Sequence, residues 1–248
     1  MKFRWTYVWI VLLLVIVFAK WNSFASLLGG TGVTEAKGFS LAAGSTVRVM
    51  SIGSSVAEGW DDPSGGGYLK RAFASLSSAE HVKFDLVNQA KAGDTVVKIE
   101  GEYLAWLKSI NPQVVVLAWG ALDDLSAHTP MNVYKQQIKT EIALAIAAHA
   151  KVFVVTPPVT RASYTQYKTQ EPQMVNTEMA IANTFPSSQV YVFDVFNQMK
   201  TYLADHHQTY VPYMADGWHP NTKGHALAGQ LLYQDMQSVV TRSGQTLS

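Results

Sequence analysis

The sequence predicts a three-layer α/β/α sandwich, in which helices cover both faces of a mostly parallel five-stranded sheet. Two observations support this fold class. Short β-branched runs alternate with longer segments whose apolar residues recur at helical spacing. The short runs are apolar at nearly every position, and strands of that kind are buried on both faces, which requires a layer of helices on each side of a parallel sheet.

The expected elements alternate between strand and helix along the chain. Each expected strand is a short run rich in Val, Ile or Phe, and each expected helix repeats its apolar residues at the helical period. No repeat of fixed period is visible, so the elements belong to one α/β domain. The strands are expected at residues 47–52, 84–88, 114–119, 152–156 and 190–195, and the helices at residues 67–77, 96–109, 133–148, 172–183 and 222–240.

Composition narrows the function classes. The chain has 248 residues and 48% hydrophobic content, which is enough to fill a sizeable core. Its 19 Lys and Arg against 18 Asp and Glu give a formal net charge of +1, so the chain lacks the basic surface typical of nucleic-acid binders. The absence of cysteine excludes disulfides, thiolate metal sites and a Cys nucleophile. No cofactor is implied.

The N-terminal residues have the pattern of an export signal. Lys2 and Arg4 precede an apolar run at residues 5–19, and positive charge before an apolar run favours a cytoplasmic N-terminus. A membrane-spanning helix needs about 20 apolar residues, so the run is short for an anchor, and small residues offer a cleavage site after Ala25. Residues 1–25 are therefore predicted to be either a signal peptide or an N-terminal membrane anchor, with the remainder of the chain outside the cytoplasmic membrane.

A glycine-rich segment without periodicity follows at residues 26–45 and predicts a flexible linker. Residues 46–248 are then the folded domain. In open parallel α/β sheets the ligand crevice lies beyond the carboxyl ends of the strands. The residues that follow each expected strand are therefore the first candidates for a functional site.

Ser55 follows the first expected strand, where the chain turns into a helix. A hydroxyl at this point projects into the crevice, beside helical N–H groups that can stabilise an oxyanion. Taken alone, a Gly-Ser-Ser turn is more often a helix cap than the site of a nucleophile.

Asp216 and His219 precede the last expected helix. A carboxylate three residues before an imidazole can bind its Nδ1–H and leave Nε2 free to take a proton from a serine. The alternative is a Pro-Asn turn with a capping Asp. Because Ser55 and this segment fall independently on the same edge of the predicted sheet, a nucleophile with its base and an orienting acid is the better interpretation.

Three segments resemble the motif blocks of the SGNH hydrolases, also called GDSL-type esterases and lipases. Residues 52–60 resemble the first block and place Ser55 at the nucleophile, residues 88–95 are similar to the second and place Gly93 as an oxyanion donor, and residues 216–221 resemble the final Asp-x-x-His-Pro block. The resemblance implies a flavodoxin-like SGNH hydrolase fold for residues 46–248. It also implies an oxyanion hole built from the backbone N–H groups of Ser55 and Gly93.

The chain departs from the family pattern at two positions. The family's first block usually has Asp where this chain has Ser54. Its third block reads Gly-x-Asn-Asp with an oxyanion-binding Asn, whereas this chain has one extra residue and no Asn there, so Asp123 occupies the Asn position if Asp124 aligns with the family's Asp. An ionised Asp123 cannot donate a hydrogen bond and would oppose a developing oxyanion. Burial can instead keep such a carboxyl protonated and donating. Asp123 is therefore a candidate member of the oxyanion hole, with a purely structural carboxylate as the alternative.

Other candidates carry weaker signals. The glycine-rich residues 61–67 lack the ending of a phosphate-binding loop and are expected to form a mobile rim of the crevice. His225 has no partner at metal-ligand spacing and is expected at the surface. Trp60 and Trp218 flank the predicted catalytic segments and can form an apolar or sugar-stacking wall.

The sequence therefore predicts a serine hydrolase for carboxylic esters, acyl or acetyl, that acts outside the cytoplasmic membrane. The expected partner is a small-molecule or polymer-borne ester, such as an acylated polysaccharide, a cell-wall ester or a lipid. Nucleic acid is not expected, and membrane contact is expected only through the N-terminal segment. Two alternatives remain open, a catalytically weakened glycan- or envelope-binding module and an acyltransferase of the same fold.

Overall fold

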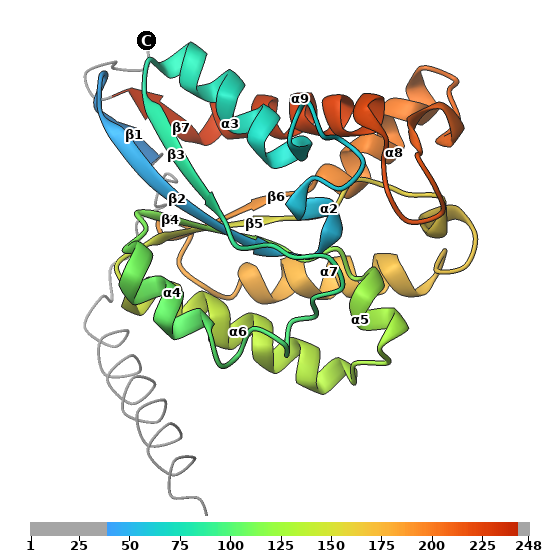
Figure 1. Ribbon diagram of the computed structural model, residues 1–248, viewed down its shortest axis with the longest axis horizontal. Coiled ribbons are helices and arrows are strands. Elements are labelled where there is room, and N and C mark those ends of the chain that lie inside the picture. Colours follow the sequence, from blue (N-terminus) through green and yellow to red (C-terminus); the bar gives the residue numbers. More distant parts are fainter. Residues whose placement is uncertain (1–38, 243–248) are drawn as a thin grey trace, which may run out of the picture. The chain divides into compact units, whose positions relative to one another are not determined.

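A five-stranded sheet in the order β3-β2-β4-β5-β6 runs through the centre of the folded domain (Figure 1). The structure is a computed structural model and describes residues 39–242. Every neighbouring pair in this sheet is parallel, which confirms the predicted fold class. The strands are β2 (Thr46–Gly53), β3 (Lys83–Asn88), β4 (Val114–Ala118), β5 (Lys151–Val155) and β6 (Val190–Phe193), each within two residues of its predicted bounds.

Side chains of the central strands alternate between two apolar cores, one on each face of the sheet. In β4, Val114 and Val116 belong to one core while Val115 and Leu117 belong to the other, and all five residues of this strand are buried. This alternation explains the continuous apolar runs in the sequence, because each face of the strand needs its own apolar residues. β3 lies at the edge of the sheet and is correspondingly less buried.

Helices form a layer on each side of the sheet (Figure 1). At Gly229, an added Cβ would lie 2.8 Å from the Cβ of Arg71 and 3.0 Å from the carbonyl oxygen of Tyr68, so glycine lets the last helix approach its neighbour closely. One layer contains α3 (Gly67–Glu80), α8 (Val195–Asp205) and α9 (Thr222–Val239), and the other contains α4 (Tyr103–Ile110), α6 (Met131–Ala147) and α7 (Gln170–Ala182).

The topology creates a switch point at the carboxyl end of β2. The chain passes from β2 to β3 on one side and then returns to β4 on the other side of β2, so the connections diverge at this point. Such a switch point is where open α/β sheets bind ligands. Two short helices begin here, α2 (Ser55–Glu58) after β2 and α5 (Leu122–Ser126) after β4.

One predicted helix is wrong over its first half. Residues 96–102 form turns, and only Tyr103–Ile110 is helical where residues 96–109 were expected. The physical reason is that Val96 donates its backbone N–H to the carboxylate of Asp124 at 3.3 Å instead of entering a helix. Val96 and Ile99 are buried in the core, so their apolar spacing reflects burial of a turn segment.

Other elements begin or lie where none was predicted. β1 (Phe39–Leu41) falls inside the expected linker and pairs in parallel with β7 (Val240–Arg242), so ordered structure starts before Thr46. α8 was not predicted at all, because the expected strand at residues 190–195 included the residues that begin this helix. Single turns η1 (Ala162–Tyr164) and η2 (Val211–Tyr213) lie in the connections that follow β5 and α8.

The predicted signal or anchor at residues 1–25 lies outside the described residues. Within residues 39–242, none of the helices combines the length and the apolar character needed to cross a bilayer.

Candidate active site

Ser55 is the first residue of α2 and lies at the carboxyl end of β2, as predicted. Gly53 makes this turn possible, because its φ is +155° and an added Cβ would lie 2.3 Å from the carbonyl oxygen of Ala118 in the neighbouring strand. The chain then closes one helical turn, in which the carbonyl of Ser54 accepts from Glu58 at 2.9 Å. Ser55 is only 6% exposed, so its hydroxyl lies in a confined position at the switch point.

Asp216 and His219 lie in a loop that is closed at both ends. Met214 and Pro220 form an antiparallel bridge, and Ala215 donates its N–H to the carbonyl of His219 at 3.0 Å. Asn221 caps α9 directly afterwards by accepting from the N–H of Gly224 at 3.0 Å. The loop therefore places His219 just before the amino-terminal end of α9, on the side where Ser55 lies.

The carboxylate of Asp216 is fixed by two backbone donors. Its Oδ1 accepts from the N–H groups of Trp218 and His219, both at 2.7 Å, which leaves Oδ2 to bind Nδ1 of His219 at 2.8 Å. Partial burial raises the pKa of Asp216, but the hydrogen bonds from the His219 ring and from the two N–H groups outweigh burial. The net pKa lies below its ordinary value, so the carboxylate stays ionised.

The three predicted side chains meet in one hydrogen-bonded chain. Nε2 of His219 lies 3.0 Å from Oγ of Ser55, although 164 residues separate them in sequence. With Nδ1 bound to the carboxylate of Asp216, the neutral ring carries its proton on Nδ1 and turns the lone pair of Nε2 toward the hydroxyl. This is the geometry required for a base to activate a serine.

Gly93 lies in the loop after β3, next to the turn that carries Ser55. Hydrogen bonds tie the two segments together: Lys91 donates its N–H to the carbonyl of Gly53 at 3.2 Å, and Ala92 donates to the carboxylate of Glu58 at 2.7 Å. Gly93 has a left-handed φ of +76°, a conformation that favours glycine. The predicted oxyanion donor is thus held at the same edge of the sheet as Ser55.

The two residues that depart from the family pattern contact each other. Ser54 precedes Ser55, and its hydroxyl hydrogen-bonds to the carboxyl of Asp123 in the first turn of α5. Burial raises the pKa of Asp123, while the hydrogen bond from Ser54 and the nearby His219 and Lys98 oppose that rise. Ser54 and Asp123, the two positions at which the resemblance implies Asp and Asn, therefore interact with each other next to Ser55.

We expect Asp123→Asn to preserve or raise ester hydrolysis, because an amide is a permanent donor toward an oxyanion whereas a carboxyl donates only when protonated. Steady-state kinetics on p-nitrophenyl acetate would measure the effect. Asp85→Asn, at an exposed position of the edge strand β3, is the control. A loss of about tenfold or more in Asp123→Asn would instead mean that the carboxyl itself is needed.

His225 contradicts its prediction as a surface residue, because it is fully buried in α9. The N–H of Tyr68 donates to Nδ1 at 3.2 Å, so the ring proton is on Nε2, which donates to the carbonyl of Trp60 at 2.9 Å. Burial lowers the pKa of His225 and favours this neutral form. The side chain links α9 and α3 to the segment beside the active site. Sequence spacing gave no signal for it.

The glycine-rich residues 61–67, expected to form a mobile rim, are held by an ion pair between buried Asp62 and partly exposed Arg71. Asp62 is fully buried and binds Arg71 through two hydrogen bonds of 2.8 and 2.9 Å, and it also accepts from the N–H of Gly67 at 3.1 Å. The hydrogen bond with Arg71 is the largest influence on Asp62 and, together with the other donors, lowers its pKa to about 2. This segment is a structured wall of the crevice.

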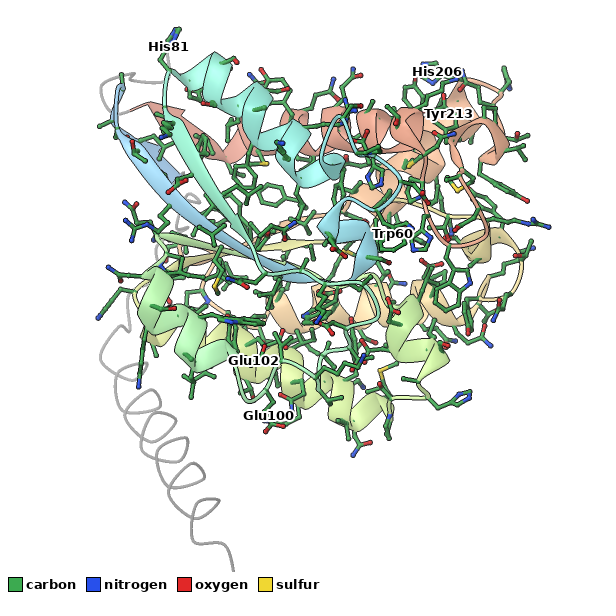
Figure 2. The ribbon with its side chains drawn as sticks, viewed as in Figure 1. Trp60, His81, Glu100, Glu102, His206 and Tyr213 are labelled. Atoms are coloured by element: carbon green, nitrogen blue, oxygen red, sulfur yellow. The ribbon has the colours of Figure 1, made fainter. Side chains whose placement is uncertain are left out.

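Trp60 lies beside the site at the end of the sheet where α2 begins (Figure 2). Its side chain is among the exposed large apolar groups of residues 39–242, at 49% exposure, and its ring centroid is 5.9 Å from that of His219. Trp218 packs edge-on against Tyr167 at 6.0 Å. Both positions agree with the aromatic wall expected from the sequence. The third tryptophan near the site, Trp119, is a core residue that donates to buried Glu141 at 2.7 Å.

Asp61, Asp216 and His219 together could offer ligand atoms to a cation, since these atoms lie within 4.8 Å of one another. A metal there would compete with the hydrogen bond that orients His219, and exposed acidic groups commonly gather without a metal. The grouping of these three residues is better explained by interaction of the two carboxylates with the His219 imidazole than by a metal site.

Fold and site together define an α/β protein with a serine, a histidine and an aspartate in hydrogen-bond contact at the switch point of its parallel sheet. Residues 51–227 match the GDSL-like Lipase/Acylhydrolase family, and the chain belongs to that family. It is accordingly a carboxylic ester hydrolase, and the resemblance drawn from its three motif blocks is confirmed.

Solved structures of other proteins share the fold of this chain. The chain matches a variant of Axe2, an acetyl-xylooligosaccharide esterase from Geobacillus stearothermophilus, with a TM-score of 0.65 and 14% identity over 80% of this chain and 96% of that chain. It also matches LAE5, an alpha/beta hydrolase enzyme from the metagenome of Lake Arreo, with a TM-score of 0.62 and 18% identity over 80% and 98% of the two chains. No curated protein sequence matches the chain.

Proposed function

We propose that the chain is a serine hydrolase that cleaves carboxylic esters outside the cytoplasmic membrane through a Ser55–His219–Asp216 triad and an acyl-enzyme. The observation that carries the proposal is the continuous chain of hydrogen bonds, 3.0 Å from Ser55 to His219 and 2.8 Å from His219 to Asp216. Plain binding of an ester does not require a base placed on a buried serine hydroxyl.

In the first step Oγ of Ser55 attacks the ester carbonyl carbon as Nε2 of His219 takes the hydroxyl proton. Asp216 keeps the other ring proton on Nδ1 and stabilises the imidazolium that forms. The carbonyl oxygen becomes an oxyanion, for which the backbone N–H groups of Ser55 and Gly93 are the proposed donors, with Asp123 beside them. His219 then returns its proton to the departing alcohol, leaving an ester between the acyl group and Ser55.

In the second step a water molecule takes the place of the alcohol. His219 removes a proton from the water, whose oxygen attacks the acyl carbonyl and forms a second oxyanion in the same position. Collapse of that intermediate releases the carboxylic acid and returns the proton to Ser55. If an acceptor alcohol enters instead of water, the same acyl-enzyme gives a transferase, which would appear as product that depends on the added acceptor.

Covalent labelling tests the nucleophile directly. We expect a fluorophosphonate to modify the full chain at one site, and peptide mapping to place the adduct on Ser55. Ser55→Ala is the matched control and should remain unlabelled. An adduct on another residue, or equal labelling of wild type and Ser55→Ala, would remove Ser55 from the mechanism.

The placement outside the cytoplasmic membrane is supported by the N-terminal pattern, in which Lys2 and Arg4 precede the apolar run at residues 5–19. N-terminal sequencing of the protein from membrane and soluble extracytoplasmic fractions distinguishes the two versions. An intact Met1 in the membrane fraction means an anchor, and a new terminus at Ser26 means a cleaved signal. Recovery of the intact chain from the cytoplasm alone would contradict both.

A further inference from the structure

A second carboxylate lies beside the imidazole of His219. Oδ2 of Asp61 is 4.0 Å from the same Nδ1 that Asp216 binds at 2.8 Å. The side chain of Asp61 is 38% exposed and that of Asp216 is 52% exposed, so Asp61 is the more sheltered of the two. This contact could not be predicted from the sequence, because Asp61 belongs to a glycine-rich segment that is distant from His219 along the chain.

The backbone on both sides of Asp61 is held by buried side chains. The carbonyl of Trp60 accepts from His225 at 2.9 Å, and the carboxylate of Asp62 is clamped by Arg71 at 2.8 and 2.9 Å. Asp61 itself has a left-handed φ of +62°, which is uncommon outside glycine but tolerated by Asp and Asn. The neighbours of Asp61 on both sides are thus held by hydrogen bonds, which limits where its side chain can lie. Here it is directed at His219.

We propose that Asp61 is a second positioning carboxylate, which stabilises the His219 imidazolium and takes over Nδ1 when Asp216 is displaced. The inference rests on the proposed function, since it assigns Asp61 the role of positioning and stabilising His219, the base of that mechanism. Its physical basis is that Asp216 is more than half exposed, so water competes for its hydrogen bond to the ring. A second negative charge 4.0 Å from Nδ1 stabilises the positive charge that the ring gains when it takes the proton of Ser55, even without that direct bond.

A double-mutant cycle tests the proposal. The variants are Asp61→Asn, Asp216→Ala and the combination, all in the full chain, with kcat and KM measured on p-nitrophenyl acetate. Asn suits position 61 because it removes the charge and accepts the left-handed backbone. Ala suits position 216 because it vacates the space into which Asp61 would move. Asp205→Asn, at the exposed end of α8, is the control for charge removal alone.

We expect Asp61→Asn to lower kcat about two- to fivefold in the wild-type background. In the Asp216→Ala background the same substitution should lower kcat by a factor that is about ten times larger. KM and the melting temperature should change little between Asp216→Ala and the double variant, because the role is toward the base and not toward binding or folding. The proposal is overturned if Asp61→Asn costs the same factor in both backgrounds. It is equally overturned if the loss is accompanied by a matching fall in melting temperature.

The proposed function has a separate failure signature. If Ser55→Ala hydrolyses the ester as fast as wild type, the serine mechanism fails whatever the cycle gives. If Ser55→Ala is inactive and the cycle is additive, the serine mechanism stands and only the role of Asp61 is lost.

Discussion

Ser55→Ala is expected to lower kcat for p-nitrophenyl acetate by at least about 10⁴-fold, because no bond to the acyl group can form without Oγ. The neighbouring hydroxyl cannot substitute. Ser54 is buried and hydrogen-bonded to Asp123, and it is the residue before the helix, so its side chain leaves the chain in a different direction. Residual hydrolysis would come from the oxyanion donors and the binding crevice alone.

Ser78→Ala is the matched control, because Ser78 lies on the exposed side of α3 and its hydroxyl bonds only within its own helix, to Ala74 at 3.1 Å. Thermal melts of both variants should agree with wild type within a few degrees, which separates a chemical loss from an unfolded protein. If Ser55→Ala keeps even a tenth or so of the wild-type rate, another nucleophile carries the reaction.

The second large effect concerns stability, which should depend on pH through Glu171. This residue is fully buried in the first turn of α7, and burial raises its pKa to about 7 from an ordinary value of 4.5. The unfolded chain loses the proton near 4.5, while the folded chain keeps it until about 7. The contribution of Glu171 to the free energy of unfolding is therefore fully present below pH 4.5 and is lost as the pH rises from 4.5 to about 7. The loss is on the order of 3 kcal/mol by pH 8.

Glu171→Gln should remove this dependence, since the amide has a similar shape and does not ionise. Between pH 5 and pH 8 we expect the Glu171→Gln variant to gain about 2–3 kcal/mol of unfolding free energy relative to wild type. Urea unfolding at each pH measures it. Glu100→Gln is the control, because Glu100 is exposed and points away from the sheet (Figure 2), and its difference should stay flat.

A comparison between variant and wild type is needed because other groups oppose Glu171. Burial lowers the pKa of His225 from 6.5, so its contribution is lost as pH falls below that value. Asp62, with a pKa of about 2, loses its contribution as pH falls below 3.8. A constant destabilisation by Glu171→Gln at every pH would mean that Glu171 is ionised and paired with Lys200, whose charge lowers its pKa.

Buried carboxyls extend beyond Glu171 to the core on the other face of the sheet. Glu141 accepts from Trp119 at 2.7 Å and Glu178 accepts from Tyr134 at 3.2 Å, while the second oxygen of each has no hydrogen-bond partner among the residues described. Burial raises the pKa of both well above the ordinary value. Such groups are held neutral, and their ionisation adds to the loss of stability at high pH.

The strands and the polar residues at their ends could be predicted from the sequence, for one physical reason. β2, β4 and β5 are packed on both faces, so nearly every residue in them must be apolar. The resulting continuous apolar runs can be recognised in the sequence alone. Their carboxyl ends share one edge of the sheet, so Ser55 and the segment with Asp216 and His219 could be assigned to one site before any distance was known.

The errors arise where tertiary contacts override local pattern. Residues 96–102 have apolar spacing that fits a helix, yet the carboxylate of Asp124 captures the N–H of Val96. α8 was hidden because Val195 continues the apolar run of β6, although Asp194 already caps the helix by accepting from the N–H of Asn197 at 3.1 Å. An Asp followed by helical spacing was the available signal, and the apolar run masked it.

Asp61 and His225 belong to a further class, since nothing local marks either residue. His225 acquires its role from partners 157 and 165 residues away, Tyr68 and Trp60. Asp61 lies 4.0 Å from His219 in space, and its neighbours Trp60 and Asp62 are bound by His225 and Arg71. Contacts of this kind depend on the packing of α3 against α9, which no single-sequence pattern encodes.

The pairing of β1 with β7 determines how force would enter the domain. Both strands lie near the amino-terminal end of β2, away from α2 and the crevice (Figure 1). If residues 1–25 anchor the chain as the sequence predicts, a pull on the amino terminus would reach β1 first and load the parallel β1–β7 pair in shear. The loops that carry Ser55 and His219 lie at the opposite end of the sheet. A force applied through β1 would therefore leave the relative positions of these two side chains unchanged.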